Sequence, residues 1–392
     1  MHRILVLNLG STSFKFKLYE MGDSENMLAS GGVESIGTEG KYSVKAPGDR
    51  VEKGPCACKT HLDALDLCME AMNRLNIPVD MNTLDAVGYK AVHGGSVSGS
   101  QMIDEKLIAE MEKMAPLAPA HNPVYLAMMK SVREKYPQLP QVACFETAFH
   151  QTMPLERAVY GMPYEWVEQY GLRRYGFHGS SHSYIAWKMA QEAPYAKRVI
   201  SVHLGGSSSL CAIQDGKSVA TSMGATPQSG IFHNNRVGDM DVFMLPVLVK
   251  ELGGLDNVLK ALSSQGGFLG ISGVSNDMRD VEEAAAKGNQ RAQLAIDAFA
   301  DEIVGYIGMF TAYMGGVDAI TFTGGIGLNG AEFRAQVAEK LGFVKARMDP
   351  ALNKRGYEGK ISTEDSGVEI WALETNEELM VARGCTRVLN AQ

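Results

Sequence analysis

Hydrophobic and polar positions along the chain follow two different periods, and they predict strands and helices in alternation. Short apolar runs at 86–93, 141–146, 319–325 and 369–374 have the length and composition of buried strands. Apolar residues repeat at helical spacing between 290 and 314. Further helices are expected at 61–75, 123–135 and 240–252. Strands that alternate with helices in this way predict an α/β fold.

One strand–turn–strand pattern occurs twice. The segment ILVLNLGSTSFKFKLYE starts at Ile4, and VISVHLGGSSSLCAIQD starts at Val199. Each copy is an apolar run, a Gly/Ser/Thr turn and a second apolar run, which reads as two strands joined by a tight turn. Two copies about half a chain apart predict two related halves rather than a solenoid of many repeats. We expect a cleft between these halves.

Composition narrows the class of protein. The chain has 392 residues, 45% of them hydrophobic and 21% charged, with a formal net charge of -8. An acidic chain without a basic run is not expected to bind nucleic acid. The apolar run Ile4–Leu7 is too short for a signal-peptide core, and no stretch reaches the roughly 20 apolar residues of a membrane span. We therefore expect a cytoplasmic protein with no membrane partner.

The cysteines allow one metal hypothesis. There are six cysteines, irregularly spaced, so no disulfide framework is expected. Cys56, Cys58, His61 and Cys68 could supply four zinc ligands, but their spacing matches no zinc module. Ordinary intracellular thiols are the favoured interpretation, and zinc binding is the alternative.

The two repeated turns have the chemistry of anion-binding loops. Gly10 lets the backbone turn tightly, and Ser11, Thr12 and Ser13 add hydroxyls beside successive amide groups. The second copy, Leu204–Ser209, repeats the device. A single Gly/Ser hairpin is more often only a hairpin, but two at matching places predict two phosphate loops. Neither has the G-x-x-x-x-G-K-S/T spacing of a P-loop.

Polar clusters embedded in apolar runs supply the remaining chemistry. They lie at 89–95, 118–123, 145–154, 175–182, 234–241, 322–330 and 375–378. Any one histidine among them could be a satisfied core residue. Taken together, these clusters contain the cations, the carboxylates and the glycine turns that phosphoryl transfer requires.

Four of the motifs, in this order, resemble the acetate kinase family of the actin/Hsp70/sugar-kinase superfold. They are F-E-T-A-F-H-Q-T-M-P (145–154), Y-G-F-H-G-S-S-H (175–182), T-S-M-G-A-T-P (221–227) and T-N-E-E (375–378). The likeness extends from Asn8 to Glu378. It implies a two-domain, duplicated actin-like (ribonuclease H-like) α/β fold with an inter-domain active-site cleft. We expect residues 1–149 plus 379–392 to form a carboxylate/phosphate domain and 150–378 a nucleotide-binding domain.

The resemblance also implies an activity. The family transfers the γ-phosphoryl group of ATP in line to a short-chain carboxylic acid, which gives an acyl phosphate and ADP. The expected metal is Mg²⁺, with Mn²⁺ as an alternative, and the expected assembly is a homodimer. The sequence does not indicate the physiological direction.

Residue by residue, the resemblance assigns the following site. The catalytic group is Glu146, His178 and Arg236, of which His178 and Arg236 contact the phosphoryl group in flight. The substrate-binding group, in which His121 helps to hold phosphate, is Lys90, Val92, Ala120, His121, Phe177 and Pro227. The nucleotide-binding group is Ser11, Ser13, Lys15, His203, Gly205, Gly206, Ser207, Asp277, Met278, Arg279, Gly325, Ile326, Gly327 and Asn329. The metal-binding group is Asn8 and Glu377.

Three departures from the family pattern fall where the acid should bind. Lys90 replaces an arginine, which keeps the charge and loses a bidentate fork. Glu146 replaces an aspartate, and Ala120 replaces a leucine. These changes leave two hypotheses open: acetate or propionate with compensated drift, or a larger or substituted carboxylate.

The phosphate region departs as well. Gly206 stands where the family carries asparagine, and Asn234-Asn235-Arg236, preceded by His233, replaces G-T-R. Leu328 stands where a glutamate usually follows G-I-G. Two rival classes are another actin-like ATPase and a nucleotide-binding homologue with weak or no kinase activity, and the retained His178 and Arg236 argue against both.

Overall fold

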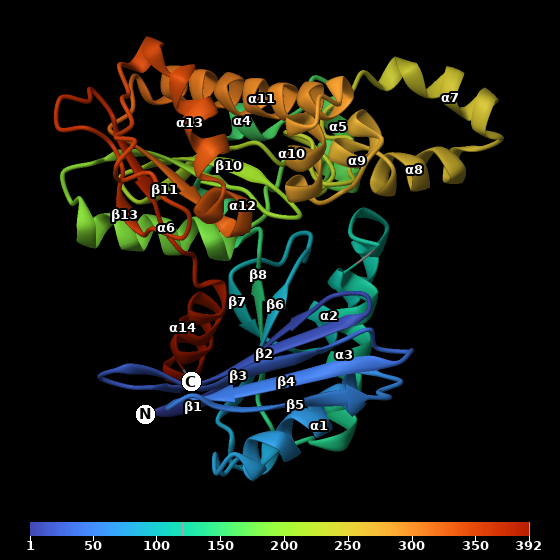
Figure 1. Ribbon diagram of the computed structural model, residues 1–392. Helices are drawn as coiled ribbons and strands as arrows, with labels where there is room; N and C mark the ends of the chain where they lie inside the picture. Colours follow the sequence, from blue (N-terminus) through green and yellow to red (C-terminus); the bar gives the residue numbers. More distant parts are fainter. Residues whose placement is uncertain (120, 392) are drawn as a thin grey trace. The chain divides into compact units, whose positions relative to one another are not determined.

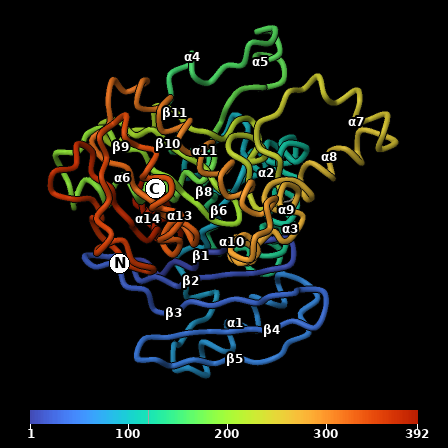
Figure 2. Tube along the Cα trace, turned by 45° about the horizontal axis from the view of Figure 1, so that its top comes forward, coloured from blue at the N-terminus to red at the C-terminus, as the bar shows by residue number. Residues whose placement is uncertain are grey.

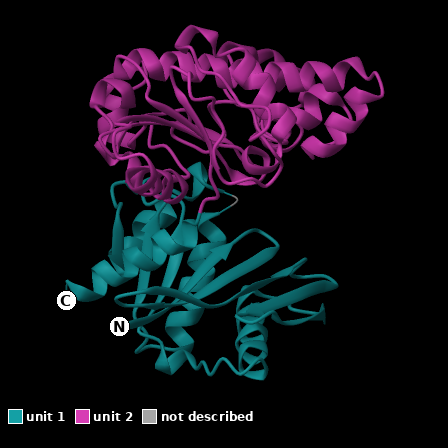
Figure 3. Ribbon diagram, turned by 60° about the vertical axis from the view of Figure 1, so that its left-hand side comes forward, with its two compact units in different colours: residues 1–148, 376–392 teal, residues 149–375 magenta. Residues whose placement is uncertain are grey.

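The chain divides into two compact units, each with its own sheet. The computed structural model describes residues 1–119 and 121–391. Unit 1 comprises Met1–Ala148 and Asn376–Gln392, and unit 2 comprises Phe149–Thr375 (Figure 3). The sequence-based division placed Glu377 in the second domain, whereas the structural division places it in unit 1. None of the helices among the described residues combines the length and apolar character that a membrane crossing needs.

Unit 1 contains an eight-stranded sheet in the order β5-β4-β3-β2-β1-β6-β8-β7 (Figure 1). Its strands are β1 (His2–Leu9), β2 (Ser13–Met21), β3 (Glu25–Glu34), β4 (Gly40–Ala46), β5 (Arg50–Cys56), β6 (Ala86–Ala91), β7 (Ser100–Met102) and β8 (Gln141–Phe145). Its helices are α1 (His61–Arg74), α2 (Glu105–Lys113), α3 (Asn122–Lys135) and α14 (Glu377–Asn390), with 3-10 turns η1 (Met81–Thr83) and η2 (Ala115–Leu117). The 3-10 turn η3 (Ala148–Thr152) begins at the unit boundary.

Strand pairing in unit 1 brings the carboxyl ends of three strands to the same edge of the sheet. β1 pairs with β2 antiparallel and with β6 parallel, and β6 pairs with β8 parallel. The carboxyl ends of β1, β6 and β8 therefore meet, since parallel strands end at the same edge. Beyond the hairpin, β3, β4 and β5 lie side by side and extend the sheet (Figure 2). α14 packs on β1, β2, β6, β7 and β8, which brings the end of the chain back to the first strands.

Unit 2 contains a six-stranded sheet in the order β11-β10-β9-β12-β14-β13. Its strands are β9 (Arg198–His203), β10 (Ser209–Gln214), β11 (Lys217–Thr221), β12 (Ala319–Thr323), β13 (Gly359–Lys360) and β14 (Glu369–Ala372). Its helices are α4 (Leu155–Ala158), α5 (Tyr164–Tyr170), α6 (Gly179–Glu192), α7 (Leu245–Leu252), α8 (Leu255–Ser264), α9 (Gly267–Ser272), α10 (Met278–Ala286), α11 (Gln290–Met314), α12 (Gly324–Asn329) and α13 (Ala331–Glu339). Two 3-10 turns complete it, η4 (Val242–Met244) and η5 (Gly342–Val344).

The two sheets repeat one topology. Each sheet has three consecutive antiparallel strands, β1–β3 in unit 1 and β9–β11 in unit 2. Two further strands lie parallel to the first of these three, on its free side: β6 and β8 beside β1, and β12 and β14 beside β9. The repeated sequence segments form the corresponding hairpins β1–β2 and β9–β10. This correspondence confirms the predicted duplicated, actin-like α/β fold.

The core of unit 2 forms around α11, the helix that the apolar repeat predicts. Asn289 caps its start and accepts hydrogen bonds from the N–H groups of Arg291 and Ala292 at 3.0 and 3.1 Å. Gly315 ends it at φ 65°, a left-handed conformation that favours glycine. Ile296, Phe299, Ile303, Ile307 and Phe310 pack against one face of the sheet, and a second cluster under α6 packs separately. Successive strand residues such as Val199 and Ile200 belong to the two different clusters, as the two-residue period of a strand requires.

Candidate functional site

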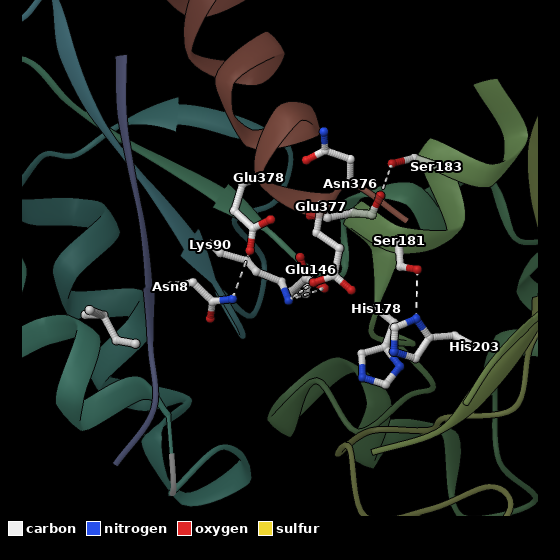
Figure 4. Close-up of polar contacts among 12 residues, drawn as sticks. Asn8, Lys90, Glu146, His178, Ser181, Ser183, His203, Asn376, Glu377 and Glu378 are labelled. Carbon is white, nitrogen blue, oxygen red and sulfur yellow. Dashed lines mark hydrogen bonds and ion pairs between the residues drawn. The ribbon is translucent and has the colours of Figure 1, made fainter. Parts of the chain in front are cut away.

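A group of charged side chains in unit 1 surrounds Lys90. Lys90 lies near the end of β6, where its Nζ pairs with Glu377 and lies 4.0 Å from Glu146 Oε2 (Figure 4). Burial alone would lower the pKa of Lys90, but the Glu146 and Glu377 carboxylates raise it above its ordinary value. Lys90 is therefore a fixed cation between two carboxylates.

The first turn of α14 supplies the acidic side of this group. Asn376 caps the helix by accepting from the Leu379 N–H at 3.3 Å, and Glu377 and Glu378 follow directly. Carboxylates are favoured there because the helix dipole is positive at its N-terminus. Glu378 lies 3.0 Å from Lys17 Nζ and accepts from Asn8 Nδ2 at 3.3 Å. Burial would raise the pKa of Glu378, but Lys17 and Lys90 hold it below its ordinary value.

The first repeated turn is held rigidly beside these residues. The Gly10 N–H donates to the Ser13 carbonyl at 2.9 Å, and a Cβ on Gly10 would lie 2.4 Å from Ser13 Oγ. From α1, His61 Nε2 donates to the Gly10 carbonyl at 2.8 Å. Ser11 and Lys15 are exposed. On the same strand as Lys15, it is Lys17 that makes the ion pair with Glu378.

Asn122 joins two of the polar motifs. It is fully buried at the start of α3, directly after His121, and it donates to the carbonyls of His93 and Met111 at 2.8 Å each. It also accepts from the His93 N–H at 3.3 Å. The 89–95 and 118–123 motifs therefore meet in unit 1. Ala120 lies outside the described residues.

A cavity of about 440 Å³ lies in unit 2 beside the second repeated turn. Its lining residues are Gly205, Gly206, Asn234, Asp277, Met278, Arg279, Glu282, Gly325, Ile326, Asn329, Gly330, Glu332 and Arg355. Eight of the fourteen residues assigned to the nucleotide by sequence line this single cavity. A volume of a few hundred Å³ and a mixture of apolar and polar groups are typical of small-molecule sites.

Hydrogen bonds position the walls of this cavity. Asp277 caps α10, and the guanidinium of Arg279, which bonds it at 3.0 and 2.5 Å, lowers the pKa of Asp277 to about 2. The Ile326 N–H donates to the Leu204 carbonyl at 2.9 Å, which ties α12 to the second turn. Arg334, fully buried, donates to the carbonyls of Gly327 and Leu328 at 2.7 Å each. Gly327 itself does not line the cavity.

Histidine and arginine side chains gather at the other side of the second turn. Arg236 Nη1 donates to Ser207 Oγ at 3.0 Å and to the Pro227 carbonyl at 3.3 Å. His178, at the N-cap of α6, has φ 57°, a strained conformation that is frequent at functional sites. Its ring lies 4.4 Å from that of His203, centroid to centroid (Figure 4). A cationic guanidinium and two imidazoles beside a glycine turn can stabilise a phosphoryl group.

Of the apolar residues assigned to the acid, Val92 lies in unit 1, whereas Phe177 and Pro227 lie in unit 2. All three are buried. Phe177 precedes His178, and its carbonyl accepts from His150 Nε2 at 2.9 Å. This bond fixes the backbone immediately before His178.

Comparison with known proteins identifies the family. The sequence model of the Acetokinase family matches residues 3–383. An acetate kinase of Geobacillus sp. (strain WCH70) is 42% identical over 397 residues, which cover 100% of both chains. This chain belongs to the acetate kinase family. The acetate kinase of Bacillus subtilis (strain 168) is 41% identical over 395 residues, covering 99% of this chain and 100% of the relative.

Solved structures of acetate kinase relatives agree with this assignment. The acetate kinase of Porphyromonas gingivalis has a TM-score of 0.89 and 36% identity, covering 99% of this chain and 100% of that one. A propionate kinase from Francisella tularensis subsp. tularensis SCHU S4 also has a TM-score of 0.89, with 35% identity and coverage of 98% and 99%. The resemblance stated from the motifs is thus confirmed over essentially the whole chain.

Two of the departures named from the resemblance, at Gly206 and Asn234, lie side by side in unit 2. Asn234 Nδ2 lies 3.8 Å from the position that a Cβ on Gly206 would take, so the Asn234 amide lies beside the glycine of the second turn. His233 is fully buried, and its Nδ1 accepts from the Ser208 N–H at 2.8 Å. Burial lowers the pKa of His233 to about 3, with Arg236 adding to the effect, so the ring is neutral.

Sequence reasoning missed several residues of the site, and the signals for them were weak. Lys17 follows Lys15 by two positions and therefore shares its strand face, which the period of a strand could have indicated. Glu378 adjoins Glu377 in T-N-E-E. Asn122 and Asn234 lay in polar clusters but were assigned no role, and Arg334 gave no signal, because their roles depend on contacts distant in sequence. The zinc alternative gains no support, since among the described residues no group of three or more His, Cys, Asp or Glu is placed to hold a metal ion.

Proposed function

We propose that this chain is a carboxylate kinase that transfers the γ-phosphoryl group of ATP to a short carboxylic acid. The observation that carries this proposal is its membership of the acetate kinase family over residues 3–383. Two further features support it: a cavity of about 440 Å³ beside a glycine-rich turn in unit 2, and the Lys90 group in unit 1. The reaction is reversible.

The acid is proposed to be acetate or propionate. Relatives of this chain are named acetate kinases, and a solved structure at 35% identity is named a propionate kinase. The hypothesis of a larger acid rested mainly on Ala120, and the comparisons do not favour it. Lys90 is proposed to hold the carboxylate of the acid, with Glu146 beside it and with Val92, Phe177 and Pro227 contributing apolar surface.

The chemistry needs no strong general base. The acid is ionised at neutral pH, so a carboxylate oxygen can attack the γ-phosphorus directly while the bond from that phosphorus to the β,γ-bridging oxygen breaks. ADP leaves and the acyl phosphate remains, with no proton to remove. We assign His178 and Arg236 to the equatorial oxygens of the transferred group, and His121 to phosphate. Charge and donors aimed at that group are the main catalytic contribution.

ADP and ATP are assigned to the unit 2 cavity. Asp277, Met278 and Arg279 on one side and Gly325, Ile326 and Asn329 on the other would hold the adenosine. The Gly205–Gly206 turn, with Ser207 and His203 behind it, would approach the phosphates, and glycine permits such close approach. Ser11, Ser13 and Lys15 are proposed for the phosphates from the first turn.

The residues of unit 1 fit a magnesium ion. Mg²⁺ takes oxygen ligands and is usually bound through one or two carboxylates together with substrate phosphates. Asn8 and Glu377 offer oxygen atoms of the right kind, and Glu378 adds a carboxylate that bonds Asn8 at 3.3 Å. The ion, or Mn²⁺ in its place, would supply charge neutralisation at the phosphates. Asn8 and the α14 carboxylates would hold the ion in position.

We also propose that the protein is a homodimer through unit 2. α7 has no buried residue, and α8 has only Val258. Phe243 is 85% exposed, and Val247 is 63% exposed. α7 and α8 project from the rest of unit 2 (Figures 1 and 2). Exposed apolar surface of this extent is typical of protein interfaces.

The test is a hydroxamate assay with ATP and magnesium across formate, acetate, propionate, butyrate and hydroxy acids. Acyl phosphate from acetate or propionate, with the highest kcat/KM of the panel, is the expected result. Turnover with a sugar but with no acid would favour another actin-like ATPase. ATP binding without any product would indicate a non-catalytic homologue. The cytoplasmic location expected from the sequence stays a prediction.

A further inference from the structure

A continuous chain of hydrogen bonds lies behind His178. His178 Nδ1 bonds Ser209 Oγ at 2.8 Å, and the same oxygen lies 2.9 Å from His182 Nε2. His182 Nδ1 in turn bonds Ser201 Oγ at 2.9 Å. Ser209, His182 and Ser201 are all fully buried, and they come from β10, α6 and β9. The functions assigned above use only His178 of these four side chains.

The chemistry of the four groups restricts where their protons lie. A serine hydroxyl carries one proton, so Ser209 can donate to only one of its two imidazole neighbours and must accept from the other. His182 is neutral, because burial holds its pKa well below the ordinary value and the neighbouring His150 and His203 lower it further. A neutral imidazole has one donor nitrogen and one acceptor nitrogen. The hydrogen bonds from Ser201 to His178 can therefore be donated in only two directions.

Ser201 decides between these directions. Among the described residues, the Ser201 hydroxyl bonds only His182. If His182 Nδ1–H donated to Ser201, the buried Ser201 proton would have no acceptor, which costs about 1–3 kcal/mol. In the opposite direction Ser201 donates to His182 Nδ1, His182 Nε2–H donates to Ser209, and Ser209 donates to His178 Nδ1. In this second direction each of the three hydrogen bonds has one donor and one acceptor, and both buried serine protons are accepted.

We propose that Ser201, His182 and Ser209 fix His178 as the neutral tautomer that carries its proton on Nε2. This inference rests on the proposed function, in which His178 contacts the phosphoryl group. A neutral imidazole with its proton on Nε2 is a ready hydrogen-bond donor to a phosphoryl oxygen. His182 and Ser209 are positioning residues, because they act through His178. The ring of His203 lies 4.4 Å from that of His178, and it is itself held by Ser181 at 2.8 Å, which fixes His178 from the side.

The direct test observes the tautomer. Protein labelled with ¹⁵N-histidine is examined by two-bond ¹H–¹⁵N NMR near pH 7.5, and the His178 signals are assigned by their loss in His178→Gln. The wild type is expected to show His178 with its proton on Nε2. Ser209→Ala is expected to lose this preference and to lower kcat about 10- to 100-fold, because a misplaced imidazole proton removes the donor. The KM values for ATP and the acid should change less than about threefold, since no contact with either substrate is removed.

A matched pair at position 182 separates positioning from packing. In His182→Gln the side-chain amide reaches the place of Nε2 and can still donate to Ser209. In His182→Asn the shorter amide takes the place of Nδ1 and cannot. We expect His182→Gln to retain the His178 tautomer and most of kcat, and His182→Asn to behave like Ser209→Ala. Thermal unfolding is measured for both variants, so that a loss of fold is recognised.

Several results would overturn the inference. One is a wild-type His178 with its proton on Nδ1, or with both nitrogens protonated. A second is an unchanged tautomer or unchanged kcat in Ser209→Ala, and a third is equal loss in the two position-182 variants. The NMR readout needs no turnover. Absence of kinase activity in the wild type would therefore contradict the proposed function alone. The tautomer measurement would still decide whether Ser201, His182 and Ser209 set the position of the His178 proton.

Discussion

Lys90 is ion-paired with Glu377, and its ammonium nitrogen lies 4.0 Å from Glu146 Oε2. We predict that Lys90→Met lowers kcat/KM for the acid at least about 100-fold. The substitution removes the ammonium that is proposed to hold the acid and leaves Glu146 and Glu377 to repel its carboxylate, and a hydrogen bond to a charged group contributes about 1.5–3 kcal/mol. The hydroxamate assay with ATP at saturation measures this effect.

Lys90→Arg is the matched control for charge. Arginine keeps the cation and can bind a carboxylate through two nitrogens. We expect this variant to retain at least about a tenth of wild-type kcat/KM. This corresponds to a loss of no more than about 1.4 kcal/mol of transition-state stabilisation. Full activity in Lys90→Met would mean that the cation does not hold the acid.

The amide of Asn234 is predicted to contact the nucleotide phosphates. Asn234 lines the unit 2 cavity, and its Nδ2, the amide atom that can donate to a phosphate oxygen, lies 3.8 Å from the position that a Cβ on Gly206 would take in the same wall. Asn234→Gly should raise the KM for ATP about tenfold or more, because bonds to charged groups contribute about 1.5–3 kcal/mol. The KM for the acid should not change.

A second substitution sharpens this prediction. Gly206→Asn combined with Asn234→Gly moves the amide from one loop to the other, and it should recover most of the ATP affinity. Asn235→Gly, which alters the adjacent residue outside the cavity lining, is the control. Equal effects of Asn234→Gly and Asn235→Gly on KM would assign the change to loop flexibility.

The stability of the folded protein at acidic pH should depend on His150. This ring is buried between Ser218 Oγ at 2.8 Å and the Phe177 carbonyl at 2.9 Å, and burial lowers its pKa to about 4. The unfolded chain, with an ordinary histidine pKa near 6.5, therefore binds more protons between pH 6.5 and 4. The stabilisation is complete above about pH 6.5 and falls as the pH is lowered towards 4.

Urea unfolding at several pH values measures this dependence. Between about pH 6 and 4.5 the slope of the unfolding free energy should decrease by about 1.4 kcal/mol per pH unit in His150→Gln, since one proton uptake is removed. His182 and His233 are also buried with lowered pKa values, so part of the slope will remain. An unchanged slope would show that His150 accepts a proton without unfolding.

The dimer is predicted to depend on the exposed apolar residues around α7. Phe243→Ser together with Val247→Ser should shift the protein to a monomer in analytical ultracentrifugation, because both side chains are exposed in a single chain. Leu294→Ser, at a residue that is 57% exposed on α11, is the control and should leave the assembly unchanged. A monomeric wild type would contradict the proposed assembly directly.

The sequence predicted those elements whose apolar pattern is complete within a single segment. The repeat between 290 and 314 gave α11 with its observed bounds, Gln290–Met314, because a helix buried over its length shows its full period. The strands β3 to β5 were not predicted, since they carry many exposed polar residues at the end of the sheet. The segment Gly324–Asn329 was predicted as a glycine turn, but it forms a short helix, and the N–H groups of Ile326 and Gly327 in its first turn donate to the Leu204 carbonyl.

The same limit applies to the site. Motifs assigned by resemblance located the cavity of unit 2, because eight of their residues line it. The partners of those residues could not be found in this way. Arg334 lies buried under α12, and Ser201 lies on a strand that reads only as apolar. Their importance depends on hydrogen bonds between distant segments, which no local pattern records.

The return of α14 to unit 1 has a consequence for how the molecule is made. Unit 2 is one uninterrupted stretch of chain, Phe149–Thr375, whereas unit 1 needs both its first 148 residues and the segment that begins at Asn376. Domains generally fold as units during synthesis. Unit 2 can therefore reach its fold on the ribosome while the β1–β8 sheet still lacks its covering helix. Glu377 and Glu378 lie at the start of α14, so their carboxylates are added when this helix docks. The sheet is therefore covered in the same step that completes the charged group around Lys90.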